Sequence, residues 1–223
     1  MWEELPREKP LARREHARSL GVVAHLQRDS MSPFLPKTMT SLVKRLKDSD
    51  VLVREAASES IGKLCRYVPP PVEGGTPLSV FFKPLFHAME SPNREWQHGA
   101  GLAIAHVVQN AHRRLSEATE LARFLPRLLK AVSFPESGGE APLLHAIALV
   151  VSHLGAQIAA QPLQDLTAAA IRGLQSIDRN ARQEAAGSLE VIVTRMGPTM
   201  SIESTQEVLQ ALELHKYDKV VYL

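Results

Sequence analysis

The segment RLKDSDVLVREAASESIGKL, residues 45–64, ends one amphipathic pattern and begins another within about four residues. The first pattern has helical spacing at Met39, Leu42, Val43 and Leu46. Asp50 follows, and a carboxylate at that point can accept hydrogen bonds from the free amides of a new helical turn. The second pattern then runs through Val53, Ala57, Ile61 and Leu64. We therefore predict two antiparallel helices joined by a short turn.

This hairpin pattern recurs along the chain. A shift of 43 residues carries the second pattern onto Trp96, Ala100, Ile104 and Val107, and a shift of 128 carries it onto Ala181, Ala185, Leu189 and Ile192. The turn recurs as Asp48-Ser49-Asp50, Ser91-Pro92-Asn93 and Ser176-Ile177-Asp178. A weaker copy lies 41 residues upstream, at Arg13, Leu20, Gly21 and Val23. A two-helix repeat of this length is typical of HEAT and armadillo arrays, in which neighbouring hairpins bury each other's apolar faces.

The sequence thus predicts an all-α fold, an α-solenoid of about five HEAT/armadillo-type helical hairpins with incomplete end repeats. We expect one array over 1–223, with repeats at approximately 10–28, 34–68, 78–112, 117–160 and 163–196 and a partial repeat at 202–223. Within them we expect helices at 10–28, 34–47, 51–68, 78–90, 94–112, 117–132, 143–160, 163–175, 179–196 and 202–214. The Pro- and Gly-rich segments 69–77 and 133–142 should be connections. No opening helix precedes the first pattern, and the last stops where a partner helix should begin. Either the chain is a fragment, or something else covers these ends.

Composition restricts the function classes. The 223 residues are 44% hydrophobic, 22% charged and only 5% aromatic, which favours a soluble helical protein. The single cysteine, Cys65, allows no internal disulfide and no zinc–thiolate cluster, so we expect a reducing, cytoplasmic compartment. The chain contains no apolar run of the length of a signal peptide or a membrane span, so we expect no membrane partner.

The motifs of catalysis are also missing from the sequence. None of the nine histidines has the spacing of a metal site, and His106 and His153 fall in apolar helical stretches where packing is their expected role. No nucleophile elbow or phosphate-binding loop occurs. We therefore expect no enzyme activity, no cofactor, no metal and no small-molecule substrate. Nucleic acid is not expected as a partner either, because the net charge is only +2 and no aromatic–basic alternation is present.

Charge points instead to the turns within the repeats, which line up along one edge of a stacked array. Residues 1–68 hold 13 Lys and Arg against 9 Asp and Glu, whereas residues 131–223 hold 6 against 10. The basic side chains of the turns are Lys47, Arg54, Arg94, Arg179, Arg182, Lys216 and Lys219. Arg54 and Arg182 are also placed to pair with an aspartate of a neighbouring repeat, while Lys47 and Arg94 have less obvious partners within the chain. Trp96 occupies an apolar slot, as a core residue or as a half-exposed anchor.

Three stretches resemble a known family. SLVKRLKDSDVLVREA (41–56), FFKPLFHAMESPNREWQHGAGLAIAHVV (81–108) and KYDKV (216–220) are similar to the HEAT-repeat domain of the plant tortifolia/spiral family of microtubule-associated proteins. The resemblance extends over roughly residues 10–220. It implies a TOG-like array that contacts tubulin or the microtubule lattice through the turns within the repeats. The candidate contacts it implies are Lys47, Arg54, Arg94, Arg179, Arg182 and Lys219.

Three functions follow as hypotheses. The first is a non-catalytic protein that binds acidic tubulin or microtubules through the turn-borne residues, with Trp96 and Lys216 included, and that is located on the cytoskeleton. The second is a general HEAT scaffold for another protein, indifferent to the turn charges. The third is a structural component of a larger assembly such as a ciliary axoneme. Purified chain that needs a co-expressed neighbour to stay soluble would favour the third.

Overall fold

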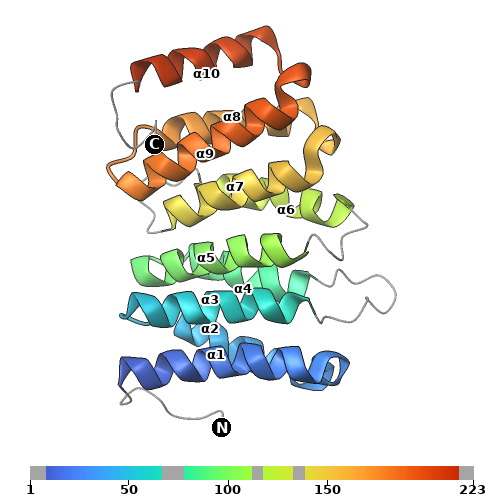
Figure 1. The fold of residues 1–223 in the computed structure, drawn as a ribbon, viewed down its shortest axis with the longest axis vertical. Helices are drawn as coiled ribbons and strands as arrows, with labels where there is room; N and C mark the ends of the chain where they lie inside the picture. Colours follow the sequence, from blue (N-terminus) through green and yellow to red (C-terminus); the bar gives the residue numbers. More distant parts are fainter. Residues whose placement is uncertain (1–8, 67–77, 112–117, 133–138, 216–223) are drawn as a thin grey trace. The chain divides into compact units, whose positions relative to one another are not determined.

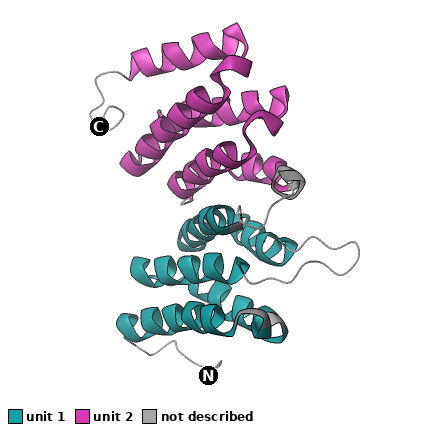
Figure 2. Ribbon diagram, turned by 45° about the vertical axis from the view of Figure 1, so that its right-hand side comes forward, with its two compact units in different colours: residues 1–116 teal, residues 117–223 magenta. Residues whose placement is uncertain are grey.

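The computed structural model describes residues 9–66, 78–111, 118–132 and 139–215, and these ranges contain ten α-helices and no β-strand. The all-α prediction is therefore confirmed for the described part of the chain. The helices form two compact units, residues 1–116 and residues 117–223 (Figure 2). None of the helices in the described ranges has both the length and the apolar character needed to cross a lipid bilayer.

The first unit contains two complete hairpins and one additional helix. Its elements are α1 (Pro10–Gln27), the 3-10 helix η1 (Arg28–Phe34), α2 (Leu35–Arg45), α3 (Val51–Cys65), α4 (Ser79–Met89) and α5 (Arg94–Ala111). Helix α3 packs between α1 and α5, while α2 packs on α3 and α4 packs on α5. Figure 1 shows α1, α3 and α5 as one layer, with α2 and α4 behind it.

The second unit repeats this arrangement. It contains α6 (Ala118–Val132), α7 (Glu140–Leu154), η2 (Gly155–Gln157), α8 (Ala160–Gly173), α9 (Arg179–Met196), η3 (Gly197–Thr199) and α10 (Ile202–Leu214). Helix α7 packs along α9, α6 packs on α7, α8 packs on α9, and α10 packs on α8 (Figure 1). By the repeat spacing, the even-numbered helices are the first helices of their hairpins and the odd-numbered helices, α1 included, are the second helices.

The hairpin turns are capped as the sequence predicts. The Asp50 side chain accepts hydrogen bonds from the amides of Leu52 and Val53 at 2.9 and 3.2 Å. Asn93 and Asp178 do the same for α5 and α9, at distances of 2.7 and 2.9 Å. These bonds satisfy amides that would otherwise lack a partner in the first turn, which is why a helix can restart so soon after the previous one ends.

The repeated apolar slots form the core. In α3 the side chains of Val53, Ala57, Ile61 and Leu64 are all fully buried, and their counterparts in α9 are at most 1% exposed. Trp96, the α5 counterpart of Val53, is only half-buried. Small residues let the second helices approach closely. A Cβ atom added at Gly62 would lie 2.7 Å from the Cβ of His106, and Ser60 donates a hydrogen bond of 2.8 Å to the carbonyl of Ala17.

Helix ends differ from the prediction at several places. Residues 29–33, which lie between the predicted helices 10–28 and 34–47, belong to the 3-10 helix η1. Helices α7 and α8 begin three residues earlier than predicted, because Pro142 and Pro162 lie in their first turns, where no amide bond within the helix is required. Helix α7 ends at Leu154 rather than at 160, because Gly155 has a φ angle of 48°. The connection 69–77 lies outside the described residues.

Candidate functional site

The candidate site is the set of turns between the two helices of each hairpin, taken separately in each unit, and we call these turns the turn ridge. Its described members are residues 46–50, 90–93 and 174–178, together with the first residues of α3, α5 and α9. The predicted contact residues Lys47, Arg54, Arg94, Trp96, Arg179 and Arg182 all lie in the described part of this ridge. Lys216 and Lys219 fall outside the described residues, as does segment 133–138 of the turn between α6 and α7.

Lys47 and Trp96 come together in the first unit. The Lys47 ammonium lies 5.7 Å from the centroid of the Trp96 ring, a distance at which a cation is attracted to the face of an indole. The His87 ring meets the same indole edge-on, with centroids 6.4 Å apart. Lys47 therefore has an intramolecular partner that its sequence position did not suggest. Trp96 is half-buried, and its Nε1 atom is buried with no hydrogen-bond acceptor among the residues that the structure describes.

The turn beneath Lys47 is held by an ion pair between consecutive repeats. The guanidinium of Arg13, on α1, donates two hydrogen bonds of 2.8 Å to the carboxylate of Asp48. Burial raises the pKa of Asp48, but the hydrogen bonds from Arg13 and from the Asp50 amide, with the charges of Arg13 and Arg45, outweigh it and lower the pKa below its usual value. The Asp48 carboxylate is therefore a rigid structural element of the ridge.

Arg54 and Arg182 occupy equivalent positions and make equivalent bonds. Arg54 donates to the carbonyls of Asp48 and Ser49 at 2.6 and 3.1 Å, and to the His98 ring at 3.4 Å. Arg182 donates to the carbonyls of Ser176 and Ile177, both at 3.0 Å. Both arginines thus bind the backbone of their own turn, and the aspartate pairing expected for this slot is seen at its upstream copy, Arg13. In the second unit, the Ser176 hydroxyl also links the turn to Glu140 of the preceding hairpin at 2.7 Å.

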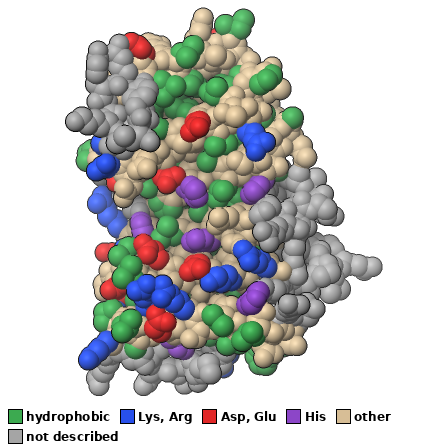
Figure 3. All heavy atoms as spheres, in the orientation of Figure 1, with side chains coloured by type: hydrophobic (Ala, Val, Ile, Leu, Met, Phe, Trp, Pro, Cys, Tyr) green, Lys and Arg blue, Asp and Glu red, His purple; other side chains and the backbone are tan. Residues whose placement is uncertain are grey.

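Arg94 and Arg179 differ from Arg54 and Arg182 in their position within the helix. Each is the first residue of its helix, and each is exposed. A cation at this position opposes the positive end of the helix dipole and costs on the order of 0.3–1 kcal/mol. These two arginines therefore do not stabilise their helices by their charge. Figure 3 shows Lys and Arg side chains, with Asp and Glu among them, on the visible face of the first unit.

One ridge residue was missed by the sequence analysis. Ile177, the middle residue of the turn between α8 and α9, is 95% exposed. Its counterparts in the other two turns are Ser49 and Pro92, so an isoleucine in the middle of a polar turn was the available signal. An apolar side chain with this exposure contributes nothing to the core, and it would lose its contact with water on binding another protein.

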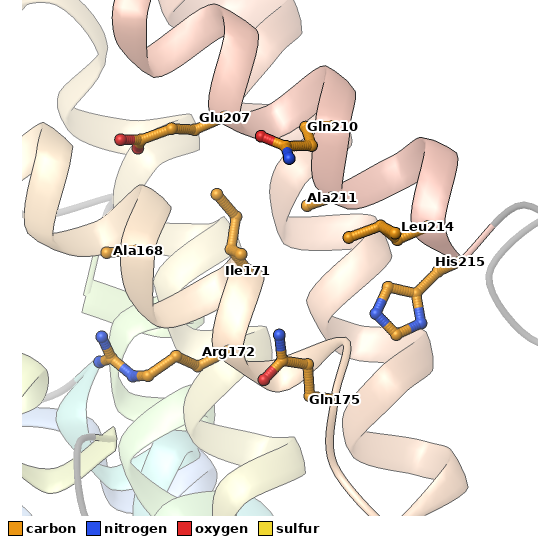
Figure 4. A pocket seen from close by; sticks show the side chains of 9 residues that line it. All are labelled: Ala168, Ile171, Arg172, Gln175, Glu207, Gln210, Ala211, Leu214 and His215. Atoms are coloured by element: carbon orange, nitrogen blue, oxygen red, sulfur yellow. The ribbon is translucent and has the colours of Figure 1, made fainter.

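A hollow of about 330 Å³ lies between α8 and α10 (Figure 4). Its lining includes the apolar side chains of Ile171 and Ala211 and the polar side chains of Arg172, Gln175, Glu207 and Gln210. It contains no nucleophile paired with a base. In the described residues generally, no three histidine, cysteine, aspartate or glutamate side chains gather as they would around a metal ion. The ridge remains the strongest candidate for a functional surface.

Comparison with known proteins shows which protein family this chain is similar to. A family model described as TORTIFOLIA1 N-terminal matches residues 2–222. The chain is 31% identical to the microtubule-associated protein TORTIFOLIA1 of Arabidopsis thaliana over 99% of its own length and 26% of that protein. It is 29% identical to TORTIFOLIA1-like protein 1 of the same plant, over 95% of this chain and 26% of that protein. The chain thus spans about a quarter of the length of these relatives.

Solved structures of low sequence identity share the fold. An engineered protein superposes with a TM-score of 0.52 at 17% identity, covering 98% of this chain and 90% of its own. A designed armadillo repeat protein, solved in complex with the peptide (KR)4, superposes with a TM-score of 0.50 at 18% identity, over 96% of this chain and 89% of its own. The predicted α-solenoid of armadillo or HEAT type is confirmed by this similarity.

Proposed function

Because the chain belongs to the TORTIFOLIA1 N-terminal family, as its resemblance to the tortifolia/spiral proteins predicted, we propose that it is a non-catalytic module that binds tubulin or microtubules through the turn ridge. One relative is named a microtubule-associated protein, and this chain spans about a quarter of that relative. The proposal places this chain on the microtubule cytoskeleton.

The exposed Arg94 and Arg179 carry the proposal. Both place a positive charge at the ridge, at a helix N-terminus where the helix dipole disfavours a cation, and tubulin is a strongly acidic partner. Lys47 adds a third charge, positioned by the Trp96 ring. Each exposed ionic contact contributes only about 0.2–1 kcal/mol, so several must act together. Apolar contact from Ile177 and the edge of Trp96 would add affinity that salt does not screen.

The test is co-sedimentation of the chain with microtubules at two salt concentrations, beside size-exclusion chromatography with unpolymerised tubulin. The ridge variant combines Lys47→Glu, Arg94→Glu and Arg179→Glu. Arg54 and Arg182 are left intact, because their bonds to turn carbonyls would make a loss of binding ambiguous. The matched control combines Lys83→Glu, Lys130→Glu and Arg195→Glu, three exposed residues outside the ridge with the same total change in charge.

We expect the wild-type chain to pellet less at the higher salt concentration. The ridge variant should bind about tenfold more weakly or worse, from three lost contacts and the new repulsion. The control variant should pellet like wild type. Equal pelleting of the ridge variant and wild type, with helicity unchanged by circular dichroism, would contradict the proposed surface. Equal weakening of both variants would indicate that only the net charge matters. A scaffold for another protein would show no tubulin binding and no effect of the ridge charges.

A further inference from the structure

The turn between α4 and α5 contains a sequence pattern that the other two described turns of the ridge lack. Ser91-Pro92-Asn93-Arg94 places a serine directly before a proline and an arginine two residues after that proline. The equivalent turns, Asp48-Ser49-Asp50 and Ser176-Ile177-Asp178, contain no proline. Ser32 and Thr76 also precede a proline, but the residue three positions after each of them is uncharged. In this sequence, therefore, Ser91 alone combines a following proline with a basic residue at the third position.

This combination is the substrate pattern of proline-directed protein kinases that also bind a basic residue. Proline has no amide hydrogen, so a kinase accepts it after the target serine only if its cleft requires no hydrogen bond from that residue. The guanidinium of Arg94 can pair with a carboxylate of the kinase. Ser91 thus has, on its C-terminal side, both features that such a kinase recognises.

The turn lies at the surface of the first unit. Pro92, Asn93 and Arg94 are exposed, and Ser91 is half-buried. The Ser91 hydroxyl accepts a hydrogen bond of 3.2 Å from the amide of Asn93, within the same turn. Modification of this hydroxyl would therefore disturb a contact inside the turn and would leave the packing between the helices intact.

The same turn is held less tightly than its two equivalents. Arg54 and Arg182 each donate two hydrogen bonds to carbonyls of their own turns, and the residue in that slot of α5 is Gln97. Gln97 donates one hydrogen bond of 2.9 Å to the Ser91 carbonyl and one of 3.5 Å to the Met89 carbonyl. A neutral amide makes weaker hydrogen bonds than a guanidinium. Because kinases bind their target segment in an extended conformation, this turn can open for a kinase at a lower cost than the other two.

We propose that Ser91 is the target of a proline-directed protein kinase, and that its phosphorylation lowers the affinity of the turn ridge for an acidic partner. The second part rests on the proposed function. In the reaction the Ser91 Oγ atom forms a bond to the γ-phosphorus of ATP, and the bond from that phosphorus to the β-phosphate oxygen breaks. The hydroxyl proton passes to the catalytic aspartate of the kinase, and ADP leaves.

The phosphate would change the charge of the ridge without unfolding the turn. Phosphoserine carries a charge of about −1.5 to −2 at pH 7. At position 91 this charge lies just before the N-terminus of α5, where the helix dipole favours an anion. It also offsets the exposed Arg94 and would repel an acidic partner. Phosphorylation should therefore weaken binding while the melting temperature stays equal or rises.

The modification is tested on the whole chain with a purified cyclin-dependent protein kinase and ATP, followed by mass spectrometry of the digested protein. Wild type should take up phosphate at Ser91, and Ser91→Ala should take up none. Pro92→Ala and Arg94→Ala should each slow the uptake by about tenfold or more, because each removes one recognised feature. Circular dichroism verifies the fold of each variant. No uptake by wild type, or uptake at Ser32 or Thr76 in place of Ser91, would overturn the proposal.

The opening of the turn has its own variant. Gln97→Arg introduces the guanidinium that Arg54 and Arg182 provide in the other turns, and it leaves residues 91–94 unchanged. It should slow phosphorylation several-fold, since its bonds to the turn carbonyls would have to break first. Gln109→Arg adds the same charge at an exposed position near the other end of α5 and should not change the rate. Equal rates for Gln97→Arg and wild type would contradict this account of the turn.

Co-sedimentation with microtubules then measures the effect on binding, with each protein compared with its own untreated form. Phosphorylated wild type should bind about threefold more weakly or worse than untreated wild type. Kinase treatment should leave the pelleting of Ser91→Ala unchanged. A phosphorylated chain that pellets like the untreated chain would overturn the effect on binding. A chain that pellets in neither form would contradict the proposed function, while the mass spectrum would still support Ser91 as the modified residue.

Discussion

Arg13 and Asp48 lie 35 residues apart and form a bidentate ion pair, with both nitrogen–oxygen distances at 2.8 Å and side chains only 12% and 8% exposed. The pair ties the second helix of one repeat to the turn of the next. Arg54 and Asp50 bond to the same short segment. The ion pair therefore links the packing of α1 on α3 to the geometry of the turn that precedes α3.

Loss of this pair should destabilise the first unit. Arg13→Ala would leave a nearly buried carboxylate without its main partner, and we expect the free energy of unfolding to fall by about 2–4 kcal/mol. Urea denaturation at pH 7 measures the change. Arg18→Ala, which removes an exposed arginine of the same helix, is the control and should change the free energy of unfolding by less than about 1 kcal/mol.

The same pair predicts a pH dependence. The pKa of Asp48 is lowered in the folded protein, so its contribution to stability is present above the unfolded pKa and is lost as the pH falls through the folded pKa. Asp48→Asn should therefore be less stable than wild type at pH 7, with the difference shrinking below about pH 4. A difference between the two proteins that is the same at pH 7 and pH 3 would contradict this account of Asp48.

Substitution by alanine should have opposite effects on the free energy of unfolding at Gly62 and at Gly187. At Gly62 an added Cβ would lie 2.7 Å from the Cβ of His106, so Gly62→Ala should cost about 1–3 kcal/mol by forcing α3 and α5 apart. At Gly187, inside α9, no atom beyond the adjoining residues and backbone of its own helix lies within 4 Å of the added Cβ. Gly187→Ala should stabilise the helix by up to about 1 kcal/mol. Thermal unfolding of both variants measures the contrast, and a shift of the same sign for both would count against the close packing of the second helices.

His145 should titrate above its usual range. A hydrogen bond of 3.0 Å that the His145 ring donates to the Glu184 carboxylate raises the pKa of His145 against the opposing effect of burial. A raised pKa adds stability that is present below the unfolded pKa and is lost as the pH rises through the folded pKa. Both side chains are more than a third exposed, so the contribution stays below about 1 kcal/mol. Titration by NMR should find a lower pKa for His145 in Glu184→Gln; an unchanged value would exclude this pairing.

Substitution of Ile177 should affect tubulin binding without affecting the stability of the fold. Because the side chain is 95% exposed, Ile177→Ser should leave the melting temperature unchanged. If the ridge is the tubulin-binding surface, the same change should weaken co-sedimentation by several-fold at high salt, where ionic contacts are screened. Val80→Ser, on the outer face of α4, should not alter pelleting. Wild-type pelleting by Ile177→Ser would remove Ile177 from the surface without affecting the role of the charges.

The helices, their period and their caps could be read from the residues alone, because these features depend on neighbours within a few positions. Asp50 caps the amides of Leu52 and Val53, and the slots of Ile61 and Leu189 are buried in both units. The family resemblance was also readable, from stretches within the first two hairpins. The starts of α7 and α8, near Pro142 and Pro162, were less predictable, because proline is tolerated in the first turn of a helix. The end of α7 before Gly155 was also less predictable, because a glycine breaks a helix only in some conformations.

The environment of each charge depended on the tertiary structure. Lys47 lies over Trp96, and Asp48 is bound by Arg13, because close packing of the second helices brings residues 35 to 49 positions apart into contact. Spacing within one helix cannot specify which side chain of a neighbouring repeat reaches a turn. Exposure likewise depends on the packed neighbours: Val53 and Trp96 occupy the same slot of α3 and α5, and the first is fully buried whereas the second is only half-buried.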